Sequence, residues 1–177
     1  KKRIALFALW GIAAMLSFAS KENAAMLPVS IFLYDLFLIQ GFTSENLKKN
    51  LKVAILPILI ILVLGHLYVD QSTIFDDYKY RPFTLWERIL TEPRVILFYI
   101  SLLLYPVNSR LTMLHDIEIS RSLFTPWSTL PAIFSILIMI IIAFWVARKR
   151  PLISFCIIFF FINHIIEGSI IPLELIF

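Results

Sequence analysis

Lys21 and Glu22 stand side by side between two apolar runs. If those runs cross a membrane, the pair lies close to hydrocarbon, where charges are costly and commonly functional. It then predicts a polar cluster that faces an external cavity. The alternative is a solvated turn whose lysine extends its ammonium group to water.

The mixed stretch DDYKYRPFTLWERILTEPR supplies three cationic candidates, Arg81, Arg88 and Arg94. Its alternation of charged, aromatic and apolar residues predicts an amphipathic helix at a membrane interface, with Trp86 as an aromatic anchor. Such a helix leaves the three arginines available to line a site.

Two histidines each have an acidic residue nearby. His115 is adjacent to Asp116, although neighbouring side chains diverge in a helix or strand. His164 and Glu167 are three positions apart and would share a helical face. The alternative for His164 is a histidine whose hydrogen bonds are satisfied inside a bundle.

The composition indicates the class of fold that positions these side chains. The 177-residue chain is 60% hydrophobic and 16% charged, whereas soluble domains are about 45–50% apolar and roughly 25% charged. The apolar excess lies in long blocks, which indicates an all-α, polytopic membrane helix bundle. A single cysteine, Cys156, excludes an internal disulfide framework.

Five apolar runs are predicted to span the membrane, and Pro28 and Pro57 are expected to kink the helices that contain them. The spans are approximately residues 4–19, 24–40, 51–69, 130–147 and 152–166. A sixth run, residues 95–105, is too short to span by itself.

Orientation follows from three basic clusters, which the positive-inside rule places in the cytoplasm. They are Lys1 to Arg3, Lys48 to Lys52, and Arg148 to Arg150. All three are cytoplasmic only if residues 95–105 do not cross. Residues 70–129 are therefore predicted to form one external region, with an interfacial or re-entrant helix at about residues 84–105.

No glycine-rich phosphate loop, nucleophile elbow, zinc-helix motif or CxxC pair occurs in the sequence. The pattern predicts no metal site and no certain cofactor, and it leaves any need for a divalent metal undetermined. The membrane partners that follow are lipids, with no sign of nucleic acid binding.

Four short motifs, in order, resemble the membrane portion of family C (GT-C) glycosyltransferases fused to tetratricopeptide repeats, relatives of the transmembrane-and-tetratricopeptide O-mannosyltransferases. They are Ser20-Lys21-Glu22, Leu90-Thr91-Glu92-Pro93-Arg94, His115-Asp116 and Pro172-Leu173-Glu174. The resemblance covers nearly the whole chain and identifies it as an internal piece of a longer protein.

The resemblance implies a polyprenyl-phosphate sugar donor, a protein or glycan acceptor, and a site on the non-cytoplasmic face. In a bacterium that face is the periplasmic side of the inner membrane. It implies that Lys21 and the three arginines bind the donor phosphate, as arginine suits phosphate oxygens. Glu22 and Asp116 would hold those cations or contact sugar hydroxyls. The catalytic residue is expected upstream of Lys1.

Other functions stay open at this point. A polysaccharide polymerase or ligase would use a similar lipid donor. A transporter or flippase for lipid-linked sugars would carry polar residues near the bilayer midplane, whereas the mid-run positions here are nearly all apolar. A non-catalytic membrane anchor would need no convergent charges.

Overall fold

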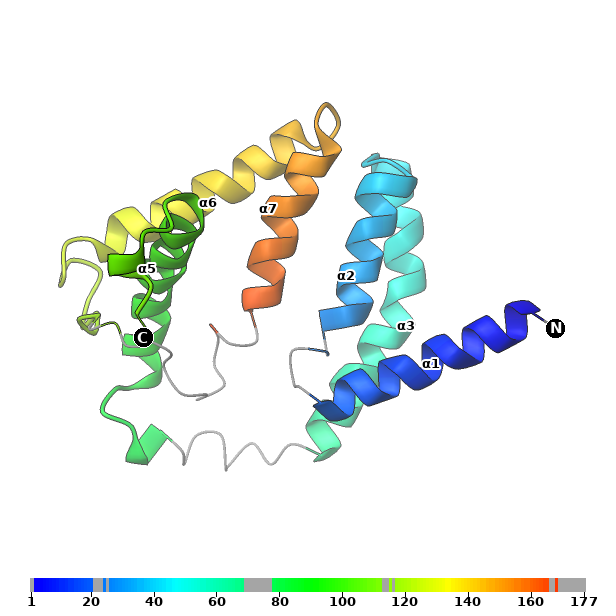
Figure 1. The fold of residues 1–177 in the computed structure, drawn as a ribbon, viewed down its shortest axis with the longest axis horizontal. Helices are drawn as coiled ribbons and strands as arrows, with labels where there is room; N and C mark the ends of the chain where they lie inside the picture. Colours follow the sequence, from blue (N-terminus) through cyan, green and yellow to red (C-terminus); the bar gives the residue numbers. More distant parts are fainter. Residues whose placement is uncertain are drawn as a thin grey trace.

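The computed structural model describes residues 2–20, 24, 26–68, 78–112, 115, 117–165 and 168. These residues form helices joined by turns and loops, with no strand in any of the described ranges. The prediction of an all-helical chain is therefore confirmed. Figure 1 shows α2, α3 and α7 alongside one another. The helix α6 runs from beside α5 to the start of α7, and α1 projects outward.

The helices lie close to the stretches that the apolar runs indicated. Their bounds are α1 Lys2–Ser20, α2 Leu27–Tyr34, the π-helical η2 Asp35–Ile39, α3 Ser44–Tyr68, the 3-10 turn η3 Tyr78–Tyr80, α5 Leu85–Leu104, the 3-10 turn η4 Asn108–Arg110, α6 Thr129–Val146 and α7 Pro151–His164. Pro28 does not kink a helix as expected, because it occupies the first turn of α2. There its missing N–H removes no intrahelical hydrogen bond.

The main core lies where α6 and α7 meet α2 and η2. Ala143 and Ala147, one turn apart on α6, are both fully buried, so the α7 backbone approaches closely. Ser154 of α7 is buried as well, and its hydroxyl donates to the carbonyl of Ala143 at 2.7 Å. Leu36 and Phe37 of η2 fill the space beside the two alanines.

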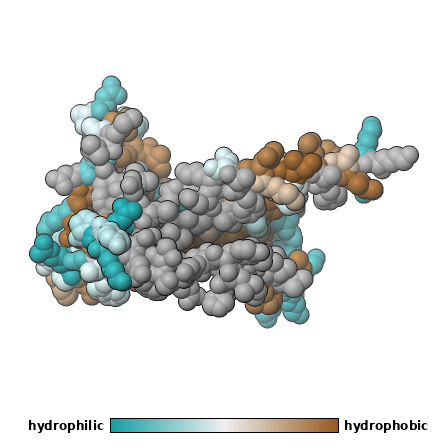
Figure 2. Space-filling model, turned by 90° about the horizontal axis from the view of Figure 1, so that it is seen from below, coloured by the Kyte–Doolittle hydropathy of each residue, from teal (hydrophilic) through white to brown (hydrophobic). Residues whose placement is uncertain are grey.

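Much of the remaining apolar surface is exposed. On α1, large apolar side chains are exposed over much of the helix surface, for example those of Ile4, Trp10 and Met15. Figure 2 shows hydrophobic surface along the arm that projects from the rest of the chain. Soluble monomers rarely expose continuous apolar patches of more than a few hundred Å². This surface therefore requires a covering apolar phase or partner.

Within the described residues, one helix is both long and apolar enough to cross a membrane, judged by length and composition. That helix is α6, whose 18 residues correspond to about 27 Å. Two further apolar helical segments, Leu27–Ile39 and Pro151–His164, are shorter.

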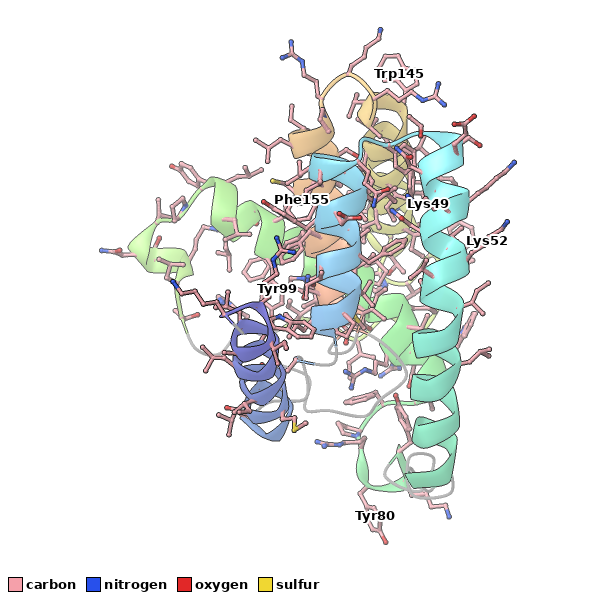
Figure 3. All side chains as sticks on the ribbon, turned by 90° about the vertical axis from the view of Figure 1, so that its right-hand side faces the viewer. Lys49, Lys52, Tyr80, Tyr99, Trp145 and Phe155 are labelled. Atoms are coloured by element: carbon pink, nitrogen blue, oxygen red, sulfur yellow. The ribbon has the colours of Figure 1, made fainter. Side chains whose placement is uncertain are left out.

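Two of the three basic clusters lie at the same end of the molecule. Figure 3 shows Lys49 and Lys52 toward the end that carries Trp145, and Tyr80 at the opposite end. The chain turns back between α6 and α7 at Arg148 to Arg150, a few residues after Trp145. Lys2 and Arg3 differ, because they lie near the free tip of the projecting α1.

A capping box defines the start of α5. The Thr84 hydroxyl accepts the Glu87 N–H at 3.3 Å, and Oε2 of Glu87 accepts the Thr84 N–H at 2.8 Å. These bonds satisfy two backbone donors that the first helical turn leaves open. The hydrogen bonds from Thr84 also hold the pKa of the Glu87 carboxyl below its usual value.

We expect Thr84→Ala to destabilise the first turn of α5 by about 1 kcal/mol, the usual cost of losing a cap. Hydrogen exchange of the amides of residues 85–88 measures the loss. Because the folded pKa of Glu87 is lowered, its contribution is present above the unfolded pKa and disappears as pH falls through the folded one. Thr84→Ser keeps the acceptor and is the matched control; equal exchange in both variants would contradict the cap.

Candidate functional site

The chain after α5 reverses and runs back along the helix that it has just left. Arg110 donates from Nη2 to the Ser101 hydroxyl at 2.6 Å. The His115 ring then lies 4.6 Å from the Phe98 ring, edge to face. Ser120 then hydrogen-bonds to Thr91, which is ten residues nearer the start of α5 than Ser101. Both ends of this helix-and-return unit are thus on the same side, where α6 begins.

Three buried hydroxyl groups lock the end of the return segment between α5 and α6. The Thr91 hydroxyl accepts the Ser120 N–H at 2.8 Å and donates to the Glu87 carbonyl at 2.7 Å. The Thr129 hydroxyl donates to the Ser120 hydroxyl at 2.8 Å. All three side chains are within 1% of full burial. Satisfied polar networks in an apolar surrounding specify one arrangement, because any other leaves donors or acceptors unpaired.

Arg94 is held by the same segment. Its Nη1 donates to the carbonyl of Glu118 at 2.6 Å and to the Ser120 hydroxyl at 3.1 Å. Within the described part of the chain, Nη2 and Nε of Arg94 make no hydrogen bond. The guanidinium is therefore oriented by one nitrogen while further N–H donors remain available to a ligand.

A groove of about 450 Å³ opens beside Arg94, between α5, the start of α6 and the return segment. Apart from Arg94 and the hydroxyl-bearing Ser128 and Ser135, its wall is apolar. The apolar lining residues are Leu97, Phe98, Ile117, Trp127, Pro131 and Ala132. The groove thus combines one oriented cation with a surface suited to hydrocarbon, the pattern that an amphiphilic anion requires. We call it the Arg94 groove.

The opposite side of α5 carries a buried ion pair. Arg88 Nη2 lies 3.3 Å from Glu92 Oε1, one helical turn away, and the side chains are 1% and 11% exposed. We expected Arg88 to line an outer pocket, but burial beside Glu92 removes it from the open surface. Burial also raises the pKa of the neighbouring Tyr78 hydroxyl, an effect that Arg88 opposes and Glu92 reinforces.

His164 lies on the Glu92 side, at the end of α7. Its Nδ1 is 2.8 Å from the Phe160 carbonyl, and the centre of its ring lies 4.2 Å from that of the Phe160 ring, with the two planes tilted by 36°. Gly168 lies between this turn and Glu92, and a Cβ added there would lie 3.0 Å from the His164 carbonyl and 3.4 Å from Glu92 Oε2. This arrangement matches the alternative of a histidine satisfied within the bundle.

The candidate residues thus fall on two faces of α5. Arg94 and His115 are on the face of the Arg94 groove, linked through Phe98. Arg88 and His164 are on the other face. Arg81 is half-buried in the turn that precedes α5. The remaining four predicted site residues lie outside the described residues: Lys21, Glu22, Asp116 and Glu167.

Sequence reasoning assigned no role to Glu92, Ser120 or Thr129. The pairing of Glu92 with Arg88 could have been predicted, because Glu92 is four residues after Arg88 and that spacing places both side chains on one helical face. Ser120 and Thr129 carried no such signal, since their partners are 29 and nine positions away. Among the described residues no three His, Cys, Asp or Glu side chains converge to hold a metal ion.

Comparisons of the chain with protein-family models, with curated proteins and with solved structures find no match in any of the three.

We expect Glu92→Leu to destabilise the fold by about 3–5 kcal/mol, because it leaves the buried Arg88 guanidinium without its carboxylate. The double variant Arg88→Met, Glu92→Leu should recover most of that loss, since no buried charge is then left over. Denaturant unfolding of the purified chain in detergent measures both. If the double variant is as unstable as the single one, the pair is not an isolated electrostatic unit.

Proposed function

We propose that this chain is part of an integral-membrane glycosyltransferase that moves a sugar from a polyprenyl-phosphate carrier to a protein or glycan. The observation that carries the proposal is the Arg94 groove, in which one oriented guanidinium faces an otherwise apolar cavity. A polyprenyl phosphate has the same division into a compact anion and a long hydrocarbon chain.

A multi-pass arrangement is the second part of the proposal. Its support is the large apolar surface that α1, α6 and α7 leave exposed, together with the length of α6. Lipid is the covering phase that accommodates apolar side chains over much of the surface of a helix such as α1. The shorter apolar helices α2 and α7 then cross with η2 and the flanking turns, in a bacterium through the inner membrane.

The orientation follows from the two ends of α6. The basic clusters of α3 and of the α6–α7 turn lie at the Val146 end of α6. The positive-inside rule assigns that end to the cytoplasm. Thr129, the hydroxyl network and the Arg94 groove are at the other end. About 27 Å of helix separates them, close to the ~30 Å thickness of a bilayer's hydrocarbon core. The groove therefore faces the non-cytoplasmic side in this proposal.

The chemistry that this end offers is stabilisation of a leaving phosphate. When the bond between sugar and phosphate breaks, negative charge accumulates on the phosphate oxygens. A cation already held in place stabilises that charge without reorganising in the transition state. The contacts of Arg94 with Glu118 and Ser120 supply this preorganisation, and Ser128 adds a hydroxyl at the groove wall.

Replacing Arg94 tests the donor site. In the intact protein we expect Arg94→Ala to lower sugar transfer from a polyprenyl-phosphate donor about tenfold or more, because a hydrogen bond to a charged group contributes about 1.5–3 kcal/mol. Arg94→Lys should also be impaired, since an ammonium lacks the guanidinium's forked geometry. Arg121→Ala, an exposed cation of the same region, is the control. Wild-type turnover in both Arg94 variants would remove this residue from the site.

The proposed orientation predicts opposite exposure of the two ends of α6. With Cys156 replaced by serine, a cysteine at Ser122 should react with an impermeant maleimide added outside intact cells. A cysteine at Lys149 should react only after permeabilisation. Labelling of both positions from the same side contradicts a membrane-crossing α6.

A further inference from the structure

The basic cluster near the start of α3 and the basic cluster between α6 and α7 form one continuous surface. The Phe42 ring, in the turn between η2 and α3, stacks 4.9 Å from Phe37 and lies 6.0 Å from Phe144, near the end of α6. Leu47 of α3 packs against the same core cluster as the buried Ala147. The turn that leads into α3 and the turn between α6 and α7 are therefore neighbours. We call their six cations the basic surface: Lys48, Lys49, Lys52, Arg148, Lys149 and Arg150.

These six cations are exposed and have no ion-pair partner among the residues that the structure describes. Two carboxylates lie nearby: Glu45 in the first turn of α3, and Asp35, which is bonded to Gln40, a residue that also bonds to Asn50. Six cations therefore outnumber the acidic groups beside them. Like charges gathered this closely repel one another, and an anionic partner relieves that repulsion.

Apolar side chains next to the cations indicate what kind of anion binds. Trp145, three residues before Arg148, is 80% exposed, and Leu152, two residues after Arg150, is 62% exposed. On α3, Val53 follows Lys52 and is 72% exposed. A soluble polyanion would leave these side chains in water. At the boundary of a bilayer, the cations meet headgroups while tryptophan and aliphatic side chains reach the acyl region.

We propose that the basic surface binds the phosphate headgroups of anionic glycerophospholipids in the cytoplasmic leaflet. This rests on the membrane placement in the proposed function, but it concerns the end of α6 opposite to the Arg94 groove. Each cation near an anionic membrane surface strengthens binding measurably. Because the six cations come from α3 and from the α6–α7 turn, bound lipid phosphates hold these elements together from outside as the Phe42 and Ala147 contacts do from inside.

Trp145 is a built-in reporter of this contact. In the intact protein, every tryptophan other than Trp145 is replaced by phenylalanine, including Trp10, Trp86 and Trp127. The protein is reconstituted in phosphatidylcholine bilayers that contain a minor fraction of phosphatidylglycerol. Either lipid is supplied in brominated form to quench fluorescence. We expect brominated phosphatidylglycerol to quench Trp145 well beyond its share of the lipid, and brominated phosphatidylcholine correspondingly less.

Substitutions in the basic surface test whether its cations cause the preference for phosphatidylglycerol. Neutralising Lys48, Lys49 and Lys52 to glutamine should lower the preference for the anionic lipid about tenfold or more, whereas changing the same residues to arginine should preserve it. Neutralising Lys2, Lys79 and Arg121, which lie outside the basic surface, also removes three positive charges and is the control for net charge. Because the arginine variant keeps both charge and length, it separates lost binding from lost folding.

Three outcomes would overturn the proposal. Equal quenching by the two lipids shows that the headgroup charge is not recognised. Displacement of phosphatidylglycerol by soluble glycerol phosphate shows an anion site that needs no bilayer. Both results leave the Arg94 groove untouched. A chain that fails to float with either vesicle overturns this proposal together with the membrane placement in the proposed function.

Discussion

The close contact between α6 and α7 at Ala143 and Ala147 determines how the functional ends of the chain are arranged. Because neither side chain extends beyond a methyl group, α7 and η2 reach the α6 backbone and Ser154 bonds directly to it. Larger residues at these two positions would push the helices apart. The basic turns would then separate, and the direction of α6 toward the Arg94 groove would change as well.

Charged residues in this apolar chain are handled in three different ways, and the difference assigns their roles. Arg88 is buried and neutralised by Glu92 within one helical face, so its contribution is structural. Arg94 is oriented by neutral oxygens and keeps unused donors, the state expected of a ligand-binding cation. The cations of the basic surface are exposed, and among the described residues none of them takes part in an ion pair. These six charges therefore act on whatever lies outside the molecule.

The hydroxyl network explains how a cation in a loop-lined groove is held in one orientation. Residues 118–120 have no secondary structure of their own, yet they support Arg94 through a carbonyl and a hydroxyl. Thr91 and Thr129 hold Ser120 from two helices, so the support is as rigid as the contact between α5 and α6. A site that relies on such indirect support can lose function through a substitution that never touches the ligand.

The sequence by itself determined the helices and the positions of the cations along them, because both depend on local patterns. The predicted runs overlap α1, α2, α5, α6 and α7, whereas α3 begins at Ser44, seven residues before the apolar run at 51 that predicted it. Only the tertiary structure decided which face of α5 each candidate occupies and which partner it meets. Arg88 and Arg94 looked alike in sequence, yet one is buried and the other faces a groove. The orientation of Arg94 depends on the segment that returns along α5, through hydrogen bonds between residues 24 to 29 positions apart. No local periodicity encodes such contacts, because they form only when separate helices pack.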